Sequence, residues 1–246
     1  MNILISNDDG IDAPGIKKLA EKLEEDHEIF IVAPTDEKSA SSHSLTLKRP
    51  LTVRQRSNNY FAVDGTPADC VNLAVNSILK RRPDLVLSGI NHGANLGEDI
   101  FYSGTVSAAM EGLLLGVPSI AFSFEMRNSS DFAPAAEFAS RLIKYVQKWG
   151  LMRDTVLNVN VPDRIIERET IYMITKQGRR IYSGAVEERT DFSGVKFYTI
   201  GSKEIKVEED LDSDFFAVNS GYVSITPLHL DLTNYSSIME LKDWKV

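Results

Sequence analysis

Two adjacent carboxylates near the start of the chain, Asp8 and Asp9, are the residues best suited to chemistry. They follow the apolar run Ile3 to Ile5, and Gly10 closes the polar group that begins at Asn7. Adjacent carboxylates repel each other, and a divalent cation relieves that repulsion. Oxygen donors suit Mg²⁺ or Mn²⁺. The group therefore predicts a hard-cation site, although Asn and Asp could also close a turn and cap the next helix.

A second candidate group lies in a polar loop at residues 35–50, after the apolar run at 29–33. Within it, Ser39 could offer a hydroxyl to a metal or a phosphate, and His43 could titrate near neutral pH. A loop of this length inside a compact domain is usually functional or disordered. Serine-rich loops are also common at solvated surfaces, so the residues alone leave both interpretations open.

A glycine- and asparagine-rich loop at 90–104 follows another apolar run, at 84–89. Its glycines permit positive φ and close approach of a ligand, and Asn91 and Asn95 supply amide groups. The tripeptide Ser103-Gly104-Thr105 stands at the predicted start of a helix, where free N–H groups and the helix dipole attract phosphate. These features together favour a phosphate cradle over a connection that only turns the chain.

Several familiar catalytic motifs are absent from the sequence. The glycine-rich stretch lacks the Gly-Lys-Ser/Thr ending of a P-loop, and the glycines after the first strand lack dinucleotide-binding spacing. There is no Gly-x-Ser-x-Gly elbow of an α/β-hydrolase. Asp8-Asp9 differs from the Asp-x-Asp of aspartyl-phosphate phosphatases, because neighbouring residues at a strand end point in different directions. Metal ligation is therefore the more economical use of the pair.

Two further groups are best explained by structure alone. In the stretch 65–70, Thr66 can cap a helix whose first turn holds Pro67, and Cys70 is predicted to be a buried small residue. Phe101 and Tyr102 could stack on a nucleotide base, but packing in the core is the commoner fate of such a pair.

The elements that position these residues alternate along the chain. Strands are predicted at 2–6, 28–33, 84–89, 118–124 and 156–161, with a strand pair at 51–63. Helices are predicted from Pro14, over 65–81, 105–116 and 131–149. This alternation predicts an α/β fold with a doubly wound, mostly parallel, Rossmann-like sheet. Ligands of such sheets bind outside the carboxyl ends of the strands, where the candidate residues stand.

The sequence after residue 162 is more charged and no longer alternates between strands and helices. We predict a catalytic core at 1–162 and, at 163–246, a β-hairpin excursion, a returning strand at 221–227 and a short terminal helix at 233–246. The charged, β-leaning excursion rarely forms a core by itself. It is therefore predicted either to be disordered at its tip or to pair with another subunit, and both parts form one structural unit.

The bulk composition limits the function classes. The chain has 246 residues, 43% hydrophobic, with a net charge of −8, which argues against binding a nucleic-acid polymer. A single cysteine rules out an intrachain disulfide and fits a reducing compartment. No signal peptide and no apolar run near membrane-spanning length is found. We therefore expect a cytoplasmic protein without a membrane partner.

Taken together, the motifs resemble those of the SurE (survival protein E) family of nucleoside monophosphate phosphatases. The resemblance extends in order over nearly the whole chain and weakens only at 163–220. It rests on Asn7-Asp8-Asp9-Gly10, Val32-Ala33-Pro34, Glu37-Lys38-Ser39-Ala40, His43-Ser44, Gly65-Thr66-Pro67-Ala68-Asp69-Cys70, Ser88-Gly89-Ile90-Asn91, Gly93, Asn95, Tyr102-Ser103-Gly104-Thr105-Val106-Ser107 and Gly221-Tyr222-Val223-Ser224-Ile225-Thr226-Pro227.

The resemblance implies one divalent metal ion, Mg²⁺ or Mn²⁺, and a homodimer or tetramer that exchanges the C-terminal segment. The implied metal ligands are Asp8, Asp9, Ser39 and Asn91. The implied phosphate contacts are Asn7, Asn95, Ser103, Gly104 and Thr105.

The expected reaction is hydrolysis of nucleoside 5′-monophosphates, with 3′-nucleotides and short polyphosphate as further substrates. The cation would polarise the phosphoryl group and lower the pKa of a bound water. Asp8 and Asp9 are the catalytic candidates, and either could act as base or nucleophile. Two alternatives stay open, a nucleotide-sensing module without turnover and a different hydrolase on the same scaffold.

Overall fold

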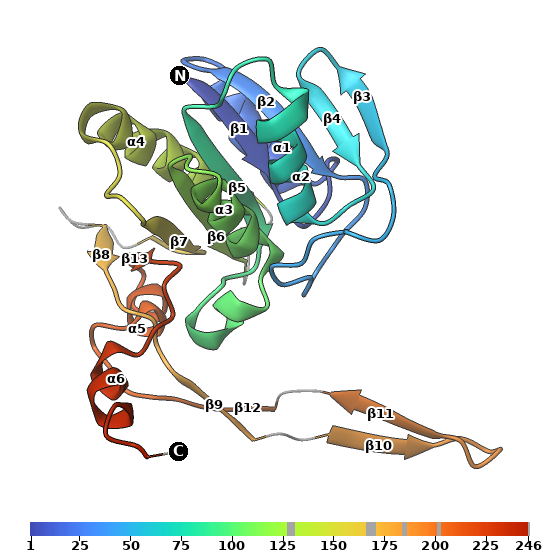
Figure 1. Cartoon of the computed structure of the whole chain (residues 1–246), viewed down its shortest axis with the longest axis vertical. Coiled ribbons are helices and arrows are strands. Elements are labelled where there is room, and N and C mark those ends of the chain that lie inside the picture. The colour runs from blue at the N-terminus through green and yellow to red at the C-terminus, as the bar shows by residue number, and fades with distance from the viewer. Residues whose placement is uncertain (127–130, 166–170, 184–185, 201–202, 246) are drawn as a thin grey trace.

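The computed structural model describes residues 1–126, 131–165, 171–183, 186–200 and 203–245. Nine strands form one sheet in the order β3-β4-β2-β1-β5-β6-β7-β13-β8 (Figure 1). Their bounds are β1 Asn2–Ser6, β2 Glu28–Pro34, β3 Val53–Ser57, β4 Tyr60–Val63, β5 Leu85–His92, β6 Ser119–Glu125, β7 Val156–Pro162, β8 Tyr172–Ile174 and β13 Val223–Leu228.

The sheet is mostly parallel and doubly wound, as predicted. β1 pairs in parallel with β2 on one side and with β5 on the other. β5, β6 and β7 continue in parallel, whereas β13 returns antiparallel to β7, and β3 runs antiparallel to β4. The chain first builds outward from β1 through β2 and later restarts at β5. The carboxyl ends of β1 and β5 therefore flank the topological switch point, where such sheets bind ligands.

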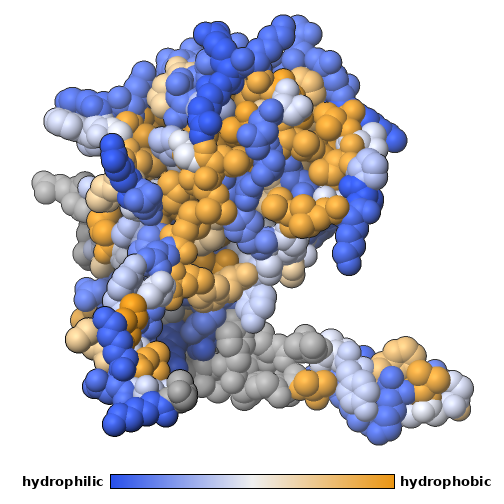
Figure 2. Space-filling model, viewed as in Figure 1, coloured by the Kyte–Doolittle hydropathy of each residue, from blue (hydrophilic) through white to orange (hydrophobic). Residues whose placement is uncertain are grey.

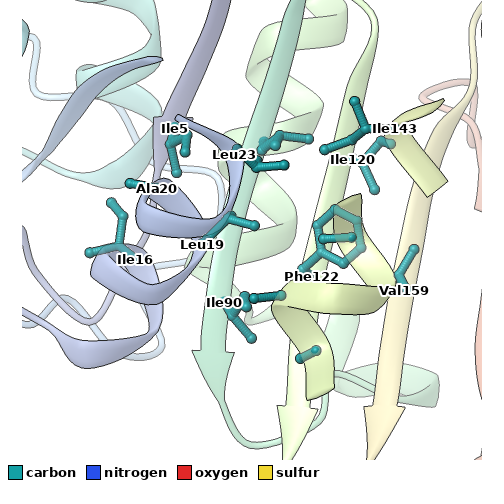
Figure 3. Packing of buried hydrophobic residues seen from close by; sticks show 14 of the residues in the cluster. Ile5, Ile16, Leu19, Ala20, Leu23, Ile90, Ile120, Phe122, Ile143 and Val159 are labelled. Atoms are coloured by element: carbon teal, nitrogen blue, oxygen red, sulfur yellow. The ribbon is translucent and has the colours of Figure 1, made fainter. Parts of the chain in front are cut away.

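Helices cover both faces of the sheet (Figure 1). Helices α1 (Pro14–Leu23) and α4 (Ala133–Trp149) pack together, and α2 (Pro67–Leu73) packs against α3 (Gly104–Leu114). Alternate residues of β1 serve the two layers: Ile3 and Ile5 join the core under α1 and α4, and Leu4 joins the core under α2 and α3. Figure 3 shows Ile5 beside the apolar face of α1. Burial on both faces holds the strand ends of the switch point in place.

Some predicted element boundaries differ from those in the structure. The helix predicted over 65–81 is α2 followed by a π-helical turn, Ala74–Ile78, and it ends there. β5 continues to His92, beyond the predicted end at residue 89, and its pairing with β6 shifts register between Ser88 and Asn91. Such an irregularity bends a strand and re-aims its side chains. Asn91 therefore lies on a strand end and not in a loop.

The C-terminal segment contains a projecting arm, which we define as strands β9 to β12 (Figure 1). β10 (Val186–Thr190) pairs with β11 (Lys196–Ile200), and β9 (Arg180–Ser183) pairs with β12 (Lys203–Val207). The prediction of a β-hairpin excursion did not include a helix, but the structure has one, α5 (Asp214–Asn219), whose N-cap is the Ser213 hydroxyl. The terminal helix is confirmed as α6 (Tyr235–Leu241). Residues 166–170, 184–185, 201–202 and 246 of the predicted segment lie outside the described residues.

Across the described ranges, no helix combines the length and the apolar character needed to cross a bilayer. Cys70 is buried and free, as predicted.

Candidate active site

The candidate residues come from four elements around the switch point. Asp8 and Asp9 directly follow β1, and Asn91 lies near the end of β5. The Lys38 backbone N–H donates to the Asp8 carbonyl at 2.7 Å, which brings the loop after β2 to the end of β1. Helix α3 begins at Gly104, and Thr105 bonds directly to Asp8. One edge of the sheet thus collects segments that lie up to about a hundred residues apart.

The turn after β1 separates the roles of its residues. The Asn7 side-chain nitrogen donates to the Gly10 carbonyl at 2.9 Å and so closes the turn. Helix α1 has Ala13 as its N-cap and no side-chain cap hydrogen bond. Asp8 and Asp9 therefore do not cap the helix. The turn interpretation holds for Asn7, and the two carboxylates are left for another purpose.

Asp8 is buried, with 6% of its surface exposed, and lies at the N-terminus of α3. The Thr105 hydroxyl donates to Oδ1, and backbone groups of Thr105 and Gly104 also bond to the carboxylate. Burial raises the pKa of Asp8, and these hydrogen bonds oppose the rise. The anion-binding helix start that we predicted for phosphate therefore already holds a carboxylate of the protein itself.

Asp9 is more exposed than Asp8 and is held by fewer donors. The His92 backbone N–H, at the end of β5, donates to Asp9 Oδ2 at 3.2 Å. Burial first, and then the charge of Asp8, raise the pKa of Asp9 to about 6. The charge of Asp8 thus makes Asp9 harder to ionise, which is the electrostatic condition that a cation would relieve.

Position 104 has to be a glycine because neighbouring segments approach its backbone closely. A Cβ at this position would lie 2.7 Å from Asp8 Cβ and 2.8 Å from Ser41 Oγ. The Ser103 hydroxyl caps the helix by accepting from the Val106 N–H at 3.1 Å. The absence of a side chain at 104 lets the β1 end, the loop after β2 and the start of α3 meet at one point.

The predicted ligand Ser39 stands apart from the carboxylates. It is exposed, and its hydroxyl donates to the Glu37 carboxylate. Two residues later, Ser41 Oγ is buried without a hydrogen-bond partner and faces Gly104 and Asp8. The loop therefore reaches the site, but its best-placed hydroxyl in the described residues is that of Ser41, which sequence reasoning missed.

The two predicted amide residues have different surroundings. Asn91 is half-buried, and its side-chain nitrogen donates to the Gly93 carbonyl at 2.8 Å, so its oxygen is the end that could ligate a cation. Asn95 is buried among polar partners of β6 and β7. Its side-chain nitrogen donates to Ser123 Oγ at 2.7 Å, and its backbone N–H donates to Asn160 Oδ1 at 2.7 Å. One N–H of the Asn95 amide is thus already used.

The donor set fits a hard cation. It consists of carboxylate, hydroxyl and amide oxygens, and a buried oxygen, Asn7 Oδ1, is without a hydrogen-bond partner next to the carboxylate pair. Among the described residues there is no group of three or more His, Cys, Asp or Glu side chains that could hold a metal ion, so a cation at this site would need neutral oxygen ligands besides Asp8 and Asp9. An unpaired buried oxygen costs free energy, and a cation with its water ligands would satisfy it.

A polar network behind the loop was also missed. Glu111 on α3 is 4% exposed and bonds both His43 and Asn72. A lone carboxylate within the apolar helix sequence Ala108 to Leu115 is the signal that could have revealed it, because buried carboxylates are rarely left unpaired.

The predicted Thr66 cap of α2 is confirmed, and Asp69 completes a capping box by bonding reciprocally with Thr66. Asp69 has a second role, because its Oδ1 accepts from the Thr46 backbone N–H at 2.8 Å and so holds the loop after β2. By contrast, the expected core packing of Phe101 and Tyr102 is wrong. They are 54% and 62% exposed, because they lie at the end of a 3₁₀ helix, Gly97–Phe101, just before the cap of α3.

Comparison with known proteins identifies the family of the chain. Residues 3–184 match the family described as survival protein SurE. Proteins named 5′-nucleotidase SurE from Geotalea daltonii and Geotalea uraniireducens are 49% and 50% identical, over 100% and 99% of both chains respectively. A crystal structure of the SurE protein from Aquifex aeolicus has a TM-score of 0.87 and 46% identity, and the match covers 98% of each chain. This chain belongs to the SurE family.

Proposed function

We propose that this protein is a metal-dependent phosphomonoesterase that hydrolyses nucleoside 5′-monophosphates to nucleoside and phosphate. The observation that carries the proposal is the pair Asp8 and Asp9, held at the switch point against the N-terminus of α3. The name 5′-nucleotidase carried by full-length relatives supports the same activity. Two carboxylates that repel each other would bind a cation, and the helix start beside them would bind a phosphate, so the two ligands would lie next to each other.

One divalent ion, Mg²⁺ or Mn²⁺, would be held by Asp8, Asp9, Ser39 and Asn91. When bound, it supplies Lewis-acid polarisation of the phosphoryl group and acidifies a water. Ser39 would have to exchange its bond to Glu37 for the cation.

The phosphate would be held by Asn7, Asn95, Ser103, Gly104 and Thr105. The helix start favours negative charge, and the backbone N–H groups there cost no reorganisation when charge develops in the transition state. The carboxylate of Asp8 bonds to the same helix start. Binding of a cation to Asp8 would weaken the hydrogen bonds between this carboxylate and the donors of the helix. The Ser103 hydroxyl uses its oxygen as the helix cap and retains its proton as a donor.

We assign the proton-accepting role to Asp9. Asp8 is fixed by the Thr105 hydroxyl and by the helix backbone, whereas Asp9 is held by the single backbone donor of His92. The pKa of Asp9, raised to about 6 in the metal-free protein, would fall again beside a cation, so the assignment to Asp9 rests on its freer position. Asp9 would take a proton from the water that attacks phosphorus, and this proton would pass to the ester oxygen as the P–O bond breaks, so that the nucleoside leaves as a neutral alcohol.

The exposed aromatics Phe101 and Tyr102 would contact the base. They immediately precede the proposed phosphate contacts, and stacking on an aromatic ring tolerates any base. This arrangement predicts broad base preference, with 3′-nucleotides and short polyphosphate as slower substrates.

The protein would work in the cytoplasm as a homodimer or tetramer that exchanges its C-terminal segment. Phe192, Val195, Phe197 and Tyr198 on the arm are exposed, and apolar side chains on the arm are visible in Figure 2. A second copy of the chain is the partner that would cover them.

The test is a panel of metals and substrates with the purified protein. Phosphate release from AMP and GMP should require Mn²⁺ or Mg²⁺, stop on chelation and return when the metal is restored. Tripolyphosphate and 3′-AMP should be hydrolysed more slowly. Nucleotide binding without any phosphate release under all of these conditions would instead support a sensing module and would refute the proposal.

A further inference from the structure

Helix α3 contacts the loop after β2 twice, at its start and two turns later. At its start, Gly104 meets Ser41 and Asp8. Two turns on, Glu111 lies with its carboxylate buried beneath the loop. Glu111 Oε2 lies 2.8 Å from His43 Nε2, and Oε1 accepts from the Asn72 side-chain nitrogen at 2.7 Å.

The remaining contacts of this part of the loop involve its backbone. The Ser42 N–H donates to the Tyr102 carbonyl at 3.1 Å, and the Thr66 hydroxyl donates to the Ser44 carbonyl at 2.7 Å. The Thr46 N–H donates to Asp69. Ser41 lies against the start of the helix at Gly104, and His43 bonds through its side chain to a carboxylate of the helix, that of Glu111.

This bond is stronger than an exposed ion pair. The hydrogen bond from His43 is the largest influence that lowers the pKa of Glu111, and it outweighs the effect of burial. Hydrogen bonds to a charged partner contribute about twice as much as neutral ones. Ser39, four residues before His43, is exposed, and its hydroxyl bonds to Glu37. Its backbone is held on one side by the bond of the Lys38 N–H to the Asp8 carbonyl and on the other side by the contacts of residues 41–43.

We propose that His43, paired with Glu111, is a positioning residue that fixes the Ser39–Ser41 segment on the helix that forms the phosphate cradle. The inference rests on the proposed function, because it assigns that segment to the cation site. Without the pair, the bonds of the Lys38 N–H to Asp8 and of the Ser42 N–H to Tyr102 would still anchor both ends of the segment, but residues 39–41 between them would be more mobile. Cation binding would then have to order these residues at an entropic cost.

The experiment measures loop order and cation affinity separately. Hydrogen–deuterium exchange over residues 36–46 is followed in the metal-free protein, and the Mn²⁺ affinity is measured by calorimetry. The variants are His43→Ala, Glu111→Gln and His43→Gln, which keeps an N–H donor toward Glu111. The control is Arg49→Ala, which removes an ion pair to Asp64 (3.1 Å) from the far end of the same loop.

His43→Ala and Glu111→Gln should both speed exchange in residues 36–46 and weaken Mn²⁺ binding about tenfold, the effect of losing one charge-assisted hydrogen bond. His43→Gln should restore most of both, and Arg49→Ala should change neither. Should His43→Ala fail to fold, Glu111→Gln compared with His43→Gln decides. Unchanged exchange and affinity in both disruptive variants would overturn the inference, whereas wild-type protein that binds no Mn²⁺ would instead refute the proposed function.

Discussion

The switch-point edge of the sheet and the projecting arm differ in how far their side chains are buried. β1, β5, β6 and β7 are buried on both faces, and polar side chains gather where these strands end. On the arm, every side chain described from 186 to 199 is exposed, on both faces of the β10–β11 ribbon. The first region draws its rigidity from within the chain, whereas the second has no core of its own.

The difference shows where each region obtains its stability. An isolated two-stranded ribbon is marginal in water, so the arm should depend on contacts with another copy. The site, in contrast, should form in a single chain. Asp214 links the two regions, since its carboxylate accepts from the Gly97 N–H at 2.8 Å, beside the site, and from the Gly178 N–H at 2.9 Å, at the base of the arm.

The largest contrast is expected between two phenylalanines. Phe122→Ala removes a fully buried side chain from the core (Figure 3) and should lower the free energy of unfolding by about 3–5 kcal/mol. Phe197→Ala on the arm should change it by less than about 0.5 kcal/mol at protein concentrations that keep the chain monomeric. Urea unfolding at two protein concentrations measures both values. If both variants lost the same free energy of unfolding at both protein concentrations, the core and the arm would not differ in the way described.

Two glycines provide the next contrast. Gly104→Ala places a Cβ against Asp8 and Ser41 and should lower kcat/KM by about a hundredfold, as expected when a site is displaced by about 1 Å. Gly194→Ala in the turn of the arm has open space but a φ of +81°, so it should cost about 1 kcal/mol locally and leave kcat/KM unchanged. Steady-state kinetics with AMP decide the matter. A fully active Gly104→Ala protein would contradict the close-approach argument.

Asp214→Ala tests the link between the regions. Removing the carboxylate leaves the Gly97 and Gly178 N–H groups without their acceptor, and each lost buried bond should lower the free energy of unfolding by about 1–3 kcal/mol. Hydrogen exchange should rise at Gly97 and Gly178 together. Lys176→Ala, which removes only an exposed pair with Asp210, is the matched control. Faster exchange at only one of the two glycines would show that the regions are not joined there.

The smallest effect concerns pH. A proton competes with the cation for Asp9, whose pKa of about 6 in the metal-free protein exceeds its ordinary value. Mn²⁺ affinity should therefore be nearly constant above pH 7 and fall up to about tenfold per unit below pH 6, one proton being displaced. For the metal-free protein the sign is opposite: folded Asp9 binds the proton more tightly than unfolded Asp9, so its contribution to stability grows from pH 6 to 4. Calorimetric titrations at pH 5 and 7 measure the affinity, and equal affinities would contradict the raised pKa.

The sequence predicted the layers and the edge at which the candidate site residues gather, because buried strands and capped helices leave local patterns. Asp8 and Asp9 stood out since two carboxylates after an apolar run are unusual. Other features depend on contacts between distant residues. The pairing of His43 with Glu111, the unpartnered Ser41 hydroxyl and the occupation of the α3 N-terminus by Asp8 leave no such local pattern. Helix α5 was hidden by its charged surroundings, because its stability comes from the buried Asp214 and Phe215 rather than from periodicity.

The most direct test of the central claim is the turnover number of Asp8→Asn and Asp9→Asn with AMP at saturating Mn²⁺. Asp12→Asn is the control, because Asp12 lies just beyond the same turn but pairs with Lys17 at the surface. Thermal unfolding establishes that each variant is folded. We predict that kcat falls at least a thousandfold in both site variants, on the order of losing a group essential to the reaction, and is unchanged in the control. Wild-type kcat in both folded site variants would contradict the central claim.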